Sequence, residues 1–231
     1  MPILKRDDQI LHFIHIPKTG GSSVSQLLQS EGWKTSPPPP LPNDMMNEIL
    51  AFTKAGRPLF GHQHASLWKL WDESVDYRFA MVRNPYERFA SQCRQIAKAE
   101  GHDNISPTYV LEKFEYVYNE VIPKLGLGAD DNHMRPQHEF IDDTTRVFRL
   151  EDQRHRLLEF LKERNLISSS CVLPYANVSF KDAPHTIVHW PFNALLHMQF
   201  LLLYGHDFDK FDYSREVPTY GLNINWKKYD D

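Results

Sequence analysis

The sequence predicts an α/β protein with a single domain, whose central, mostly parallel sheet is flanked by helices on both faces. Short apolar segments alternate along the chain with segments of helical periodicity, which is typical of parallel strands joined by crossover helices. A chain of 231 residues with 41% hydrophobic and 24% charged side chains is large and apolar enough for one hydrophobic core. We therefore expect residues 1–231 to form one domain.

Strands are predicted where short apolar runs contain β-branched or aromatic residues. The first run, Ile10–Ile16, ends at Pro17, and a weaker run spans Leu59–Gly61. Tyr77–Val82 and Arg146–Leu150 are the other two predicted strands.

Helices are predicted where apolar residues recur every three or four positions. In Ser22–Gln29, for example, Val24, Leu27 and Leu28 share one face. The other predicted helices begin near Pro85 or span Tyr109–Tyr118, Asp152–Arg164 and Pro191–Tyr204. The proline-rich segment Ser36–Pro42 is expected to be a stiff connector, and residues 126–137 a loop.

Charge and cysteine content exclude several classes of protein. The chain has 26 basic and 30 acidic side chains, a net charge of −4, which argues against a general nucleic-acid binder. Cys93 and Cys171 form no CxxC pair, so neither a disulfide framework nor a cysteine-based zinc site is indicated. The N-terminus does not read as a signal peptide, and no apolar run is long enough to span a bilayer. We expect a cytoplasmic protein without a membrane span.

The segment Pro17–Ser23, PKTGGSS, lies between a predicted strand and a predicted helix. Glycines allow a tight turn, a helix N-terminus offers N–H groups and a positive dipole end, and Lys18 adds a full charge. This pattern predicts an oxyanion-binding turn; the alternative is an ordinary turn capped by Ser22 or Ser23. It differs from the P-loop of nucleotide hydrolases, in which the lysine follows the second glycine.

A second segment, Phe79–Ser91, places Arg83 at the end of a strand and Ser91 on the helix that follows. The carboxyl edge of a parallel sheet is where such folds bind ligands, and the planar guanidinium suits a phosphate. The alternative is that Arg83 forms an ion pair with an acidic neighbour such as Glu87.

Taken together, FIHIPKTGGSS at residues 13–23 and FAMVRNPYERFAS at residues 79–91 resemble the sulfotransferases that use 3′-phosphoadenosine 5′-phosphosulfate. The likeness is greatest to the branch with Golgi carbohydrate enzymes and many bacterial relatives. Weaker similarities to the family extend over residues 10–213, and they occur at DNHMRPQ (131–137), FRLED (148–152), YANVS (175–179) and the segment 204–213.

The resemblance implies a P-loop-like sulfotransferase fold and a role for each matching residue. The residues that it implies for binding the donor are Lys18, Thr19, Gly20, Gly21, Ser22 and Ser23 at the 5′-phosphosulfate, Arg83 and Ser91 at the 3′-phosphate, and Asn177 and Ser179. His133, Arg135 and Gln137 correspond to acceptor-binding positions. Lys18 would also stabilise the leaving phosphate. The product would be adenosine 3′,5′-bisphosphate, with no metal required.

The base that takes the acceptor's proton is expected near the weak second strand. The pair Gly61-His62 resembles the position of the catalytic histidine in the heparan 2-O-sulfotransferase branch, and His64 follows closely. We favour His62 over His64 as the base, and His133 is a third candidate, although its position suits binding of the acceptor better. A zinc site formed by His62, His64 and His133 is a minor alternative, because no cysteine completes the set.

The expected activity is transfer of a sulfuryl group to a hydroxyl, or to an amine, of a carbohydrate or small metabolite. The first alternative is a P-loop-type kinase or nucleotide hydrolase. The second is a module that binds nucleotide or glycan without catalysis. The sequence specifies neither the acceptor nor the oligomeric state.

Overall fold

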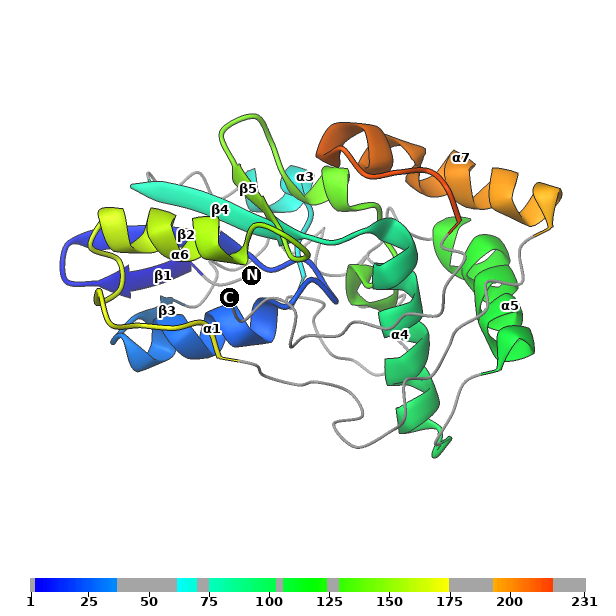
Figure 1. Cartoon of the computed structure of the whole chain (residues 1–231), viewed down its shortest axis with the longest axis horizontal. Helices are drawn as coiled ribbons and strands as arrows, with labels where there is room; N and C mark the ends of the chain where they lie inside the picture. Colours follow the sequence, from blue (N-terminus) through cyan, green and yellow to red (C-terminus); the bar gives the residue numbers. More distant parts are fainter. Residues whose placement is uncertain are drawn as a thin grey trace, which may run out of the picture.

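The computed structural model describes residues 3–36, 62–69, 75–102, 106–123, 129–174 and 193–217. Within these ranges the chain forms an α/β fold around a single five-stranded sheet in the order β3-β1-β2-β4-β5 (Figure 1). The strands are β1 (Ile3–Arg6), β2 (Gln9–Ile14), β3 (Lys34–Ser36), β4 (Tyr77–Val82) and β5 (Arg146–Arg149).

The sheet is mixed. β4 lies between β2 and β5 and is parallel to both, with Phe13 opposite Phe79 and Ala80 opposite Val147. β1 is antiparallel to β2 and to β3, so one strand interrupts the otherwise parallel arrangement that the sequence predicts. Neither β1 nor β3 is predicted from the sequence.

Helices cover both faces of the sheet, as predicted. On one face α1 (Gly21–Ser30) and α6 (Arg154–Glu163) bury the inward side chains of β2 and β4, among them Phe13 and Phe79. The other face is covered by α3, the turn η5 and the end of α7. Their bounds are Ala65–Trp68, Gln137–Phe140 and Ala194–Phe211, and they pack on residues of alternate register such as Ile14.

A third apolar cluster lies beyond the sheet, at the right-hand end of the molecule in Figure 1. It joins α4 (Pro85–Ala99), α5 (Pro107–Tyr116), the π-helical turn η2 (Val117–Val121) and α7. At its centre Phe200 packs against Tyr86, with ring centroids 4.8 Å apart. Because α4 begins directly after β4, this cluster fixes the helix that follows Arg83.

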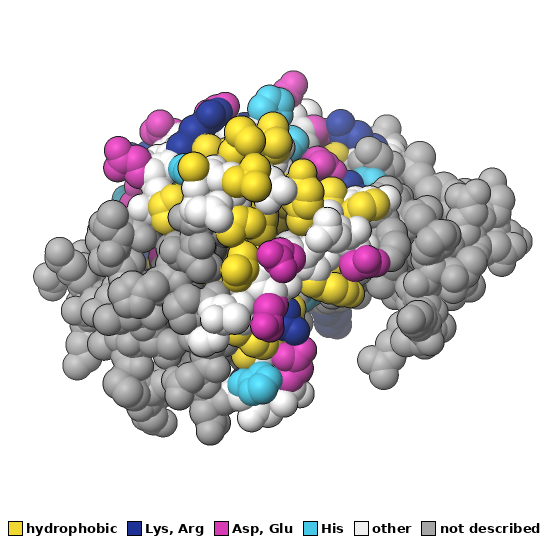
Figure 2. Space-filling view, turned by 90° about the vertical axis from the view of Figure 1, so that its right-hand side faces the viewer, with side chains coloured by type: hydrophobic (Ala, Val, Ile, Leu, Met, Phe, Trp, Pro, Cys, Tyr) yellow, Lys and Arg dark blue, Asp and Glu magenta, His cyan; other side chains and the backbone are white. Residues whose placement is uncertain are grey.

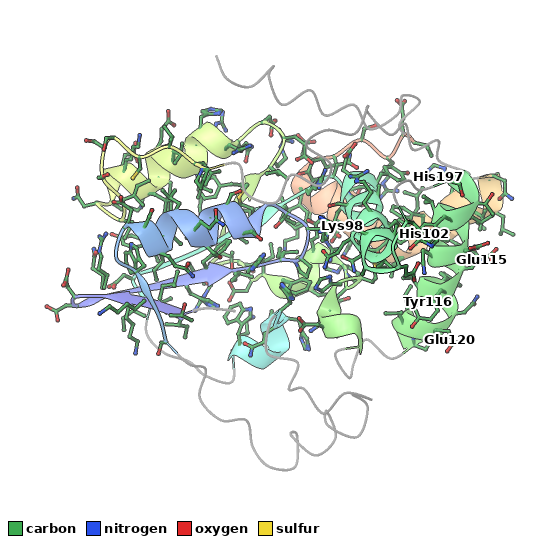
Figure 3. All side chains as sticks on the ribbon, turned by 90° about the horizontal axis from the view of Figure 1, so that it is seen from below. Lys98, His102, Glu115, Tyr116, Glu120 and His197 are labelled. Carbon is green, nitrogen blue, oxygen red and sulfur yellow. The ribbon has the colours of Figure 1, made fainter. Side chains whose placement is uncertain are left out.

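The outer surface of α5 and α7 exposes several large apolar side chains. Figure 2 shows them gathered on the face that these helices form, where Tyr116, Leu195, Met198 and Leu202 are all more than half exposed. Polar side chains border them, and Figure 3 labels Glu115 and Glu120 beside Tyr116. α7 is therefore only partly a core helix.

Most predicted elements agree with the structure, and α7 is the main difference in length. It extends to Phe211, whereas the sequence predicts an end at Tyr204. η4 (Ala129–Asn132) and η5 are 3₁₀ turns within or bordering the loop predicted for 126–137. The predicted strand Leu59–Gly61 and nearly all of the proline-rich connector lie outside the described residues. No helix among those residues is long and apolar enough to cross a membrane.

Candidate functional site

The turn between β2 and α1 is built around two glycines. Gly20 has a φ of 84°, and a methyl group there would lie 2.9 Å from Cδ1 of Leu150. A methyl group on Gly21 would lie 2.0 Å from Cδ2 of His15. A side chain at either position would displace its neighbour. The two glycines therefore allow the main chain of the turn to lie close to Leu150 and His15.

Helix α1 begins at this turn without a side-chain cap, because its N-cap residue is Gly20. The N–H groups of a first helical turn have no partner within the helix and form the positive end of its dipole. An anion at this position is therefore favoured by the N–H groups and the dipole together.

Lys18 extends from the same turn toward α4. Its φ is 67°, and its Nζ donates a hydrogen bond to Oε1 of Gln95 at 2.6 Å. Burial, with smaller contributions from the charges of Arg83 and Arg94, lowers the pKa of Lys18 to about 8. The ammonium group is thus held in a partly desolvated position where an anion would stabilise it.

Arg83 follows β4 and is buried beside the turn. Its Nη1 donates to the main-chain oxygen of Lys18 at 3.4 Å, and its Nη2 lies 3.2 Å from Oε2 of Glu87. The ion pair that the sequence left open is therefore present, although it is largely buried. Burial, the largest effect, raises the pKa of Glu87 and outweighs the opposing charge of Arg83.

One face of α4 lines the site. Glu87, Ser91, Arg94 and Gln95 recur at helical spacing, and three of them interact with Lys18 or Arg83. Ser91, predicted to bind the 3′-phosphate, lies between them and is buried.

Burial, followed by the charge of Arg83, lowers the pKa of Arg94 to about 10. Lys18, Arg83 and Arg94 therefore form a cluster of three cations. Within the described part of the chain neither Lys18 nor Arg94 forms an ion pair. The single carboxylate of Glu87 does not neutralise three cations, so the net charge of the cluster is positive.

The hydroxyl groups of the turn differ in their availability. Thr19 is buried and donates its hydroxyl proton to the main-chain oxygen of Ile16 at 2.9 Å, so in this conformation that proton serves the turn itself. Ser22 is half-buried and Ser23 is buried. The structure brings all of the predicted residues from Lys18 to Ser23 to one end of α1.

His62 lies against the carboxylate of Asp131. Its Nδ1 is 2.8 Å from Oδ2 of Asp131, and its main-chain N–H donates to Oδ1 of the same carboxylate at 3.3 Å. Burial is the largest single effect and disfavours the ionised carboxylate, but the hydrogen bonds with His62 and the charges of His62 and His133 together outweigh it and lower the pKa of Asp131. An ionised carboxylate only accepts hydrogen bonds, so Nδ1 of His62 is the donor, and in the neutral form of the ring Nε2 is the nitrogen that can accept a proton.

Two further imidazoles flank His62. The ring centroids of His15 and His133 lie 5.0 Å and 4.9 Å from that of His62, both edge-on. Burial, followed by the charge of His62, lowers the pKa of each flanking histidine to about 3. Since His15 also abuts Gly21, the histidine cluster is adjacent to the turn that carries Lys18.

Arg88 links the two halves of the site. It is 3% exposed, its Nε donates to the main-chain oxygen of Pro17 at 3.0 Å, and its Nη2 donates to that of His133 at 2.7 Å. The turn that carries Lys18 and the segment that carries His133 are thus held by one guanidinium.

The other candidate base, His64, lies outside this cluster. It is half-buried, and burial, followed by the charge of Arg135, lowers its pKa to about 4. Arg135 itself lines a separate groove of about 610 Å³. The other lining residues are Ile122, Pro136, His138, Glu139, Leu202, Leu203 and His206.

Of the three predicted acceptor-binding residues, Gln137 has the least accessible side chain. It is fully buried, and both ends of its amide bond to the main chain of Arg83. These contacts favour a positioning role rather than direct contact with an acceptor. Asn177 and Ser179, predicted to bind the donor, lie outside the described residues.

Several residues of the site are not predicted from the sequence. His15 and Asp131 belong to the sequence segments 13–23 and 131–137, which contain predicted site residues. Their position in these segments could have identified them as candidates. Gln92, Arg94 and Gln95 were detectable through their helical spacing from Arg88 and Ser91. In each case the contact depends on how the turn, α4 and the segment 131–137 meet in space.

Comparisons with known proteins identify no relative. No family model matches the chain, and neither a curated protein nor a solved structure does.

Proposed function

We propose that this protein transfers a sulfuryl group from 3′-phosphoadenosine 5′-phosphosulfate to a hydroxyl, or an amine, of a carbohydrate or small metabolite. The observation that carries the proposal is the convergence of Lys18, Arg83 and Arg94 at the uncapped start of α1. A cluster of three cations and a helix N-terminus suits a ligand with several negative charges. The family resemblance of the same segments supports this donor and the corresponding fold.

In the proposed complex the two phosphate-bearing ends of the donor bind at different parts of the cluster. Lys18 and the first N–H groups of α1 hold the 5′-phosphosulfate, and Arg83 with Ser91 holds the 3′-phosphate. Arg94 adds charge to the second subsite. The α4 face supports this division because it places Ser91 between the contacts to Arg83 and to Lys18.

The transfer itself needs a nucleophile, a base and stabilisation of the leaving group. The acceptor oxygen forms a bond to sulfur as the bond between sulfur and the bridging phosphate oxygen breaks. The acceptor's proton passes to Nε2 of His62, and Lys18 stabilises the charge that develops on the leaving phosphate. Asp131 supports this role of His62, because it holds the tautomer in which Nε2 accepts a proton.

The acceptor would approach from the side of the segment 131–137. His133 contacts the His62 ring edge-on, which places it beside the proposed base. Arg135 is more distant from this cluster and would contact the acceptor only if the acceptor extends toward the groove. The scheme requires no metal.

Calorimetric titration of adenosine 3′,5′-bisphosphate tests donor recognition. We expect it to bind much more tightly than AMP, and Arg83→Ala to remove most of that preference. Binding of ATP with magnesium in preference to the bisphosphate would instead favour a kinase or hydrolase.

Transfer of radiolabelled sulfate across a panel of sugars, amines and small alcohols then tests catalysis. We expect Lys18→Ala and His62→Ala to abolish transfer, with His62→Ala leaving nucleotide affinity nearly intact. Tight bisphosphate binding without transfer to any acceptor would indicate a binding module, and activity in His62→Ala would assign the base to another group.

A further inference from the structure

We propose that His62, Asp131 and His133 form a binding site for a divalent transition-metal cation such as Zn²⁺. One ligand atom from each residue lies within 4.8 Å of the other two. Two imidazoles and a carboxylate are ligands that Zn²⁺, Ni²⁺ and Co²⁺ accept. The proposal goes beyond sulfuryl transfer and does not depend on it.

The distances require a small rearrangement. Zn–N and Zn–O bonds of about 2.0–2.2 Å place two ligand atoms of a tetrahedral site about 3.3 Å apart. Nδ1 of His62 and Oδ2 of Asp131 are already 2.8 Å apart. The atom of His133 must therefore approach by about 1.5 Å at most, starting from the 4.8 Å limit, which side-chain rotation can supply.

Neighbouring residues orient the ligands in the way that metal sites require. Nδ1 of His133 lies 2.9 Å from Oε1 of Gln92, so this nitrogen donates its proton and Nε2 presents its lone pair. Arg88 holds the main-chain oxygen of His133, and Nδ2 of Asn132 holds that of His62 at 2.7 Å. Such outer contacts fix the tautomer and direction of a ligating imidazole.

The site would be open rather than closed. All three ligand residues are half-buried, so a cation can reach them from solvent. Three protein ligands leave at least one coordination position for water or another small ligand. His15, half-buried and in edge-on contact with the His62 ring, would form one wall.

A bound cation and a free base are mutually exclusive at His62. If the cation binds Nδ1, the ring proton moves to Nε2, which then cannot accept a proton. If the cation binds Nε2, the lone pair itself is used. Under the proposed function, Zn²⁺ would therefore inhibit transfer.

The test titrates the full-length chain, freed of metal by chelation, with Zn²⁺ in a calorimeter and with Co²⁺ followed by visible absorption. We expect one equivalent of cation at this site, with a Co²⁺ spectrum more intense than that of the aqueous ion. Gln92→Ala removes only the contact that orients the His133 ring and should lower the affinity by roughly 10–100-fold. His133→Ala removes the ligand itself and should lower the affinity by more than Gln92→Ala does.

His138→Ala is the matched control, because His138 also pairs with a carboxylate, that of Asp207, with its Nδ1 2.7 Å from Oδ1, but lies in the separate groove. We expect it to bind Zn²⁺ like the wild type. Equal affinity in wild type and His133→Ala, or equal losses in His133→Ala and His138→Ala, would overturn the proposal.

A second measurement needs no substitution. Zn²⁺ should protect His62 and His133 of the wild-type chain from carbethoxylation, as located by peptide mass spectrometry, and leave His138 reactive. Unprotected His62 and His133 at saturating Zn²⁺ would also overturn the proposal. Transfer activity is not part of either readout, so a protein that binds Zn²⁺ without transferring sulfate would contradict only the proposed function.

Discussion

The side-chain amide of Gln137 pairs with both main-chain groups of Arg83. The N–H of Arg83 donates to Oε1 at 2.8 Å, and Nε2 donates to the main-chain oxygen of Arg83 at 2.7 Å. The carboxylate of Asp207 in turn accepts the N–H of Gln137 at 2.7 Å. An element far along the chain therefore sets the position of the arginine that follows β4.

Gln137→Leu is expected to destabilise the protein and to weaken binding of adenosine 3′,5′-bisphosphate. The substitution leaves two buried main-chain groups without partners, and each such group costs about 1–3 kcal/mol. Urea unfolding and calorimetry measure the two effects. The control is Gln29→Leu on the exposed side of α1; if both variants behave alike, the pairing has no special role.

Nucleotide binding should weaken as the pH rises through about 8, because the lowered pKa of Lys18 means that its ammonium loses a proton there. The charges that face it are those of Arg83 and Arg94. Lys18→Arg keeps its charge above this pH and should remove the decline. Calorimetry with adenosine 3′,5′-bisphosphate from pH 6.5 to 9.5 measures it.

Lys98→Arg, at the exposed end of α4 (Figure 3), is the control for the Lys18 prediction. It should follow the wild-type pH profile. A decline that persists unchanged in Lys18→Arg would show that another group titrates.

Acid sensitivity of the fold should depend on His12. Its Nδ1 accepts a hydrogen bond from Nε of Arg78 at 3.2 Å, and burial, then the charge of Arg78, lowers its pKa from 6.5 to about 3. Between these values the unfolded chain binds a proton that the folded chain does not, so stability falls as the pH falls. His15 and His133 act with the same sign.

His12→Gln should therefore flatten the pH dependence of the unfolding free energy by up to about 1.4 kcal/mol per pH unit. Urea titrations between pH 7 and 4 provide the measurement. His155→Gln, exposed on α6, serves as the comparison and should follow the wild type. An unchanged slope in His12→Gln would contradict burial of a neutral imidazole.

Gln63 is a buried amide without a hydrogen-bond partner among the residues that the structure describes. It is 1% exposed, and within the described residues neither Nε2 nor Oε1 has a hydrogen-bond partner. Gln63→Met removes a desolvated polar group while keeping its volume, so we expect a gain of roughly 1–3 kcal/mol. Gln92→Met, which breaks a bond to His133, should instead lose stability. A loss in both variants would mean that Gln63 has a partner in solution.

The central strands and the helix starts are predictable because their signals are local. Tyr77–Val82 is an apolar run interrupted only by Arg78, and it matches β4 residue for residue. β1 has only four residues, two of them basic, and β3 has three; such short strands exist because their main chains pair with a neighbour. No periodicity in the sequence distinguishes them from loop.

The end of α7 shows how tertiary contacts override local signals. Gly205 reads as a helix stop, yet the helix continues because Asp207 is fully buried and accepts the N–H groups of Gln137 and His138. By contrast, the approach of Lys18 to Arg83 is predictable, because both residues follow parallel strands that are neighbours in the sheet. The contact of His62 with Asp131 joins two distant segments and is not.

The positive φ of Lys18 lowers the stability of the fold at a residue to which the proposed function assigns anion binding. A left-handed backbone costs a residue with a side chain about 1–2 kcal/mol relative to glycine, and partial burial adds the cost of desolvating an ammonium. Lys18→Gly should thus yield a protein that is harder to unfold and that, under the proposed function, binds adenosine 3′,5′-bisphosphate more weakly. Under the proposed function, this local cost is the counterpart of the charge that Lys18 brings to the donor.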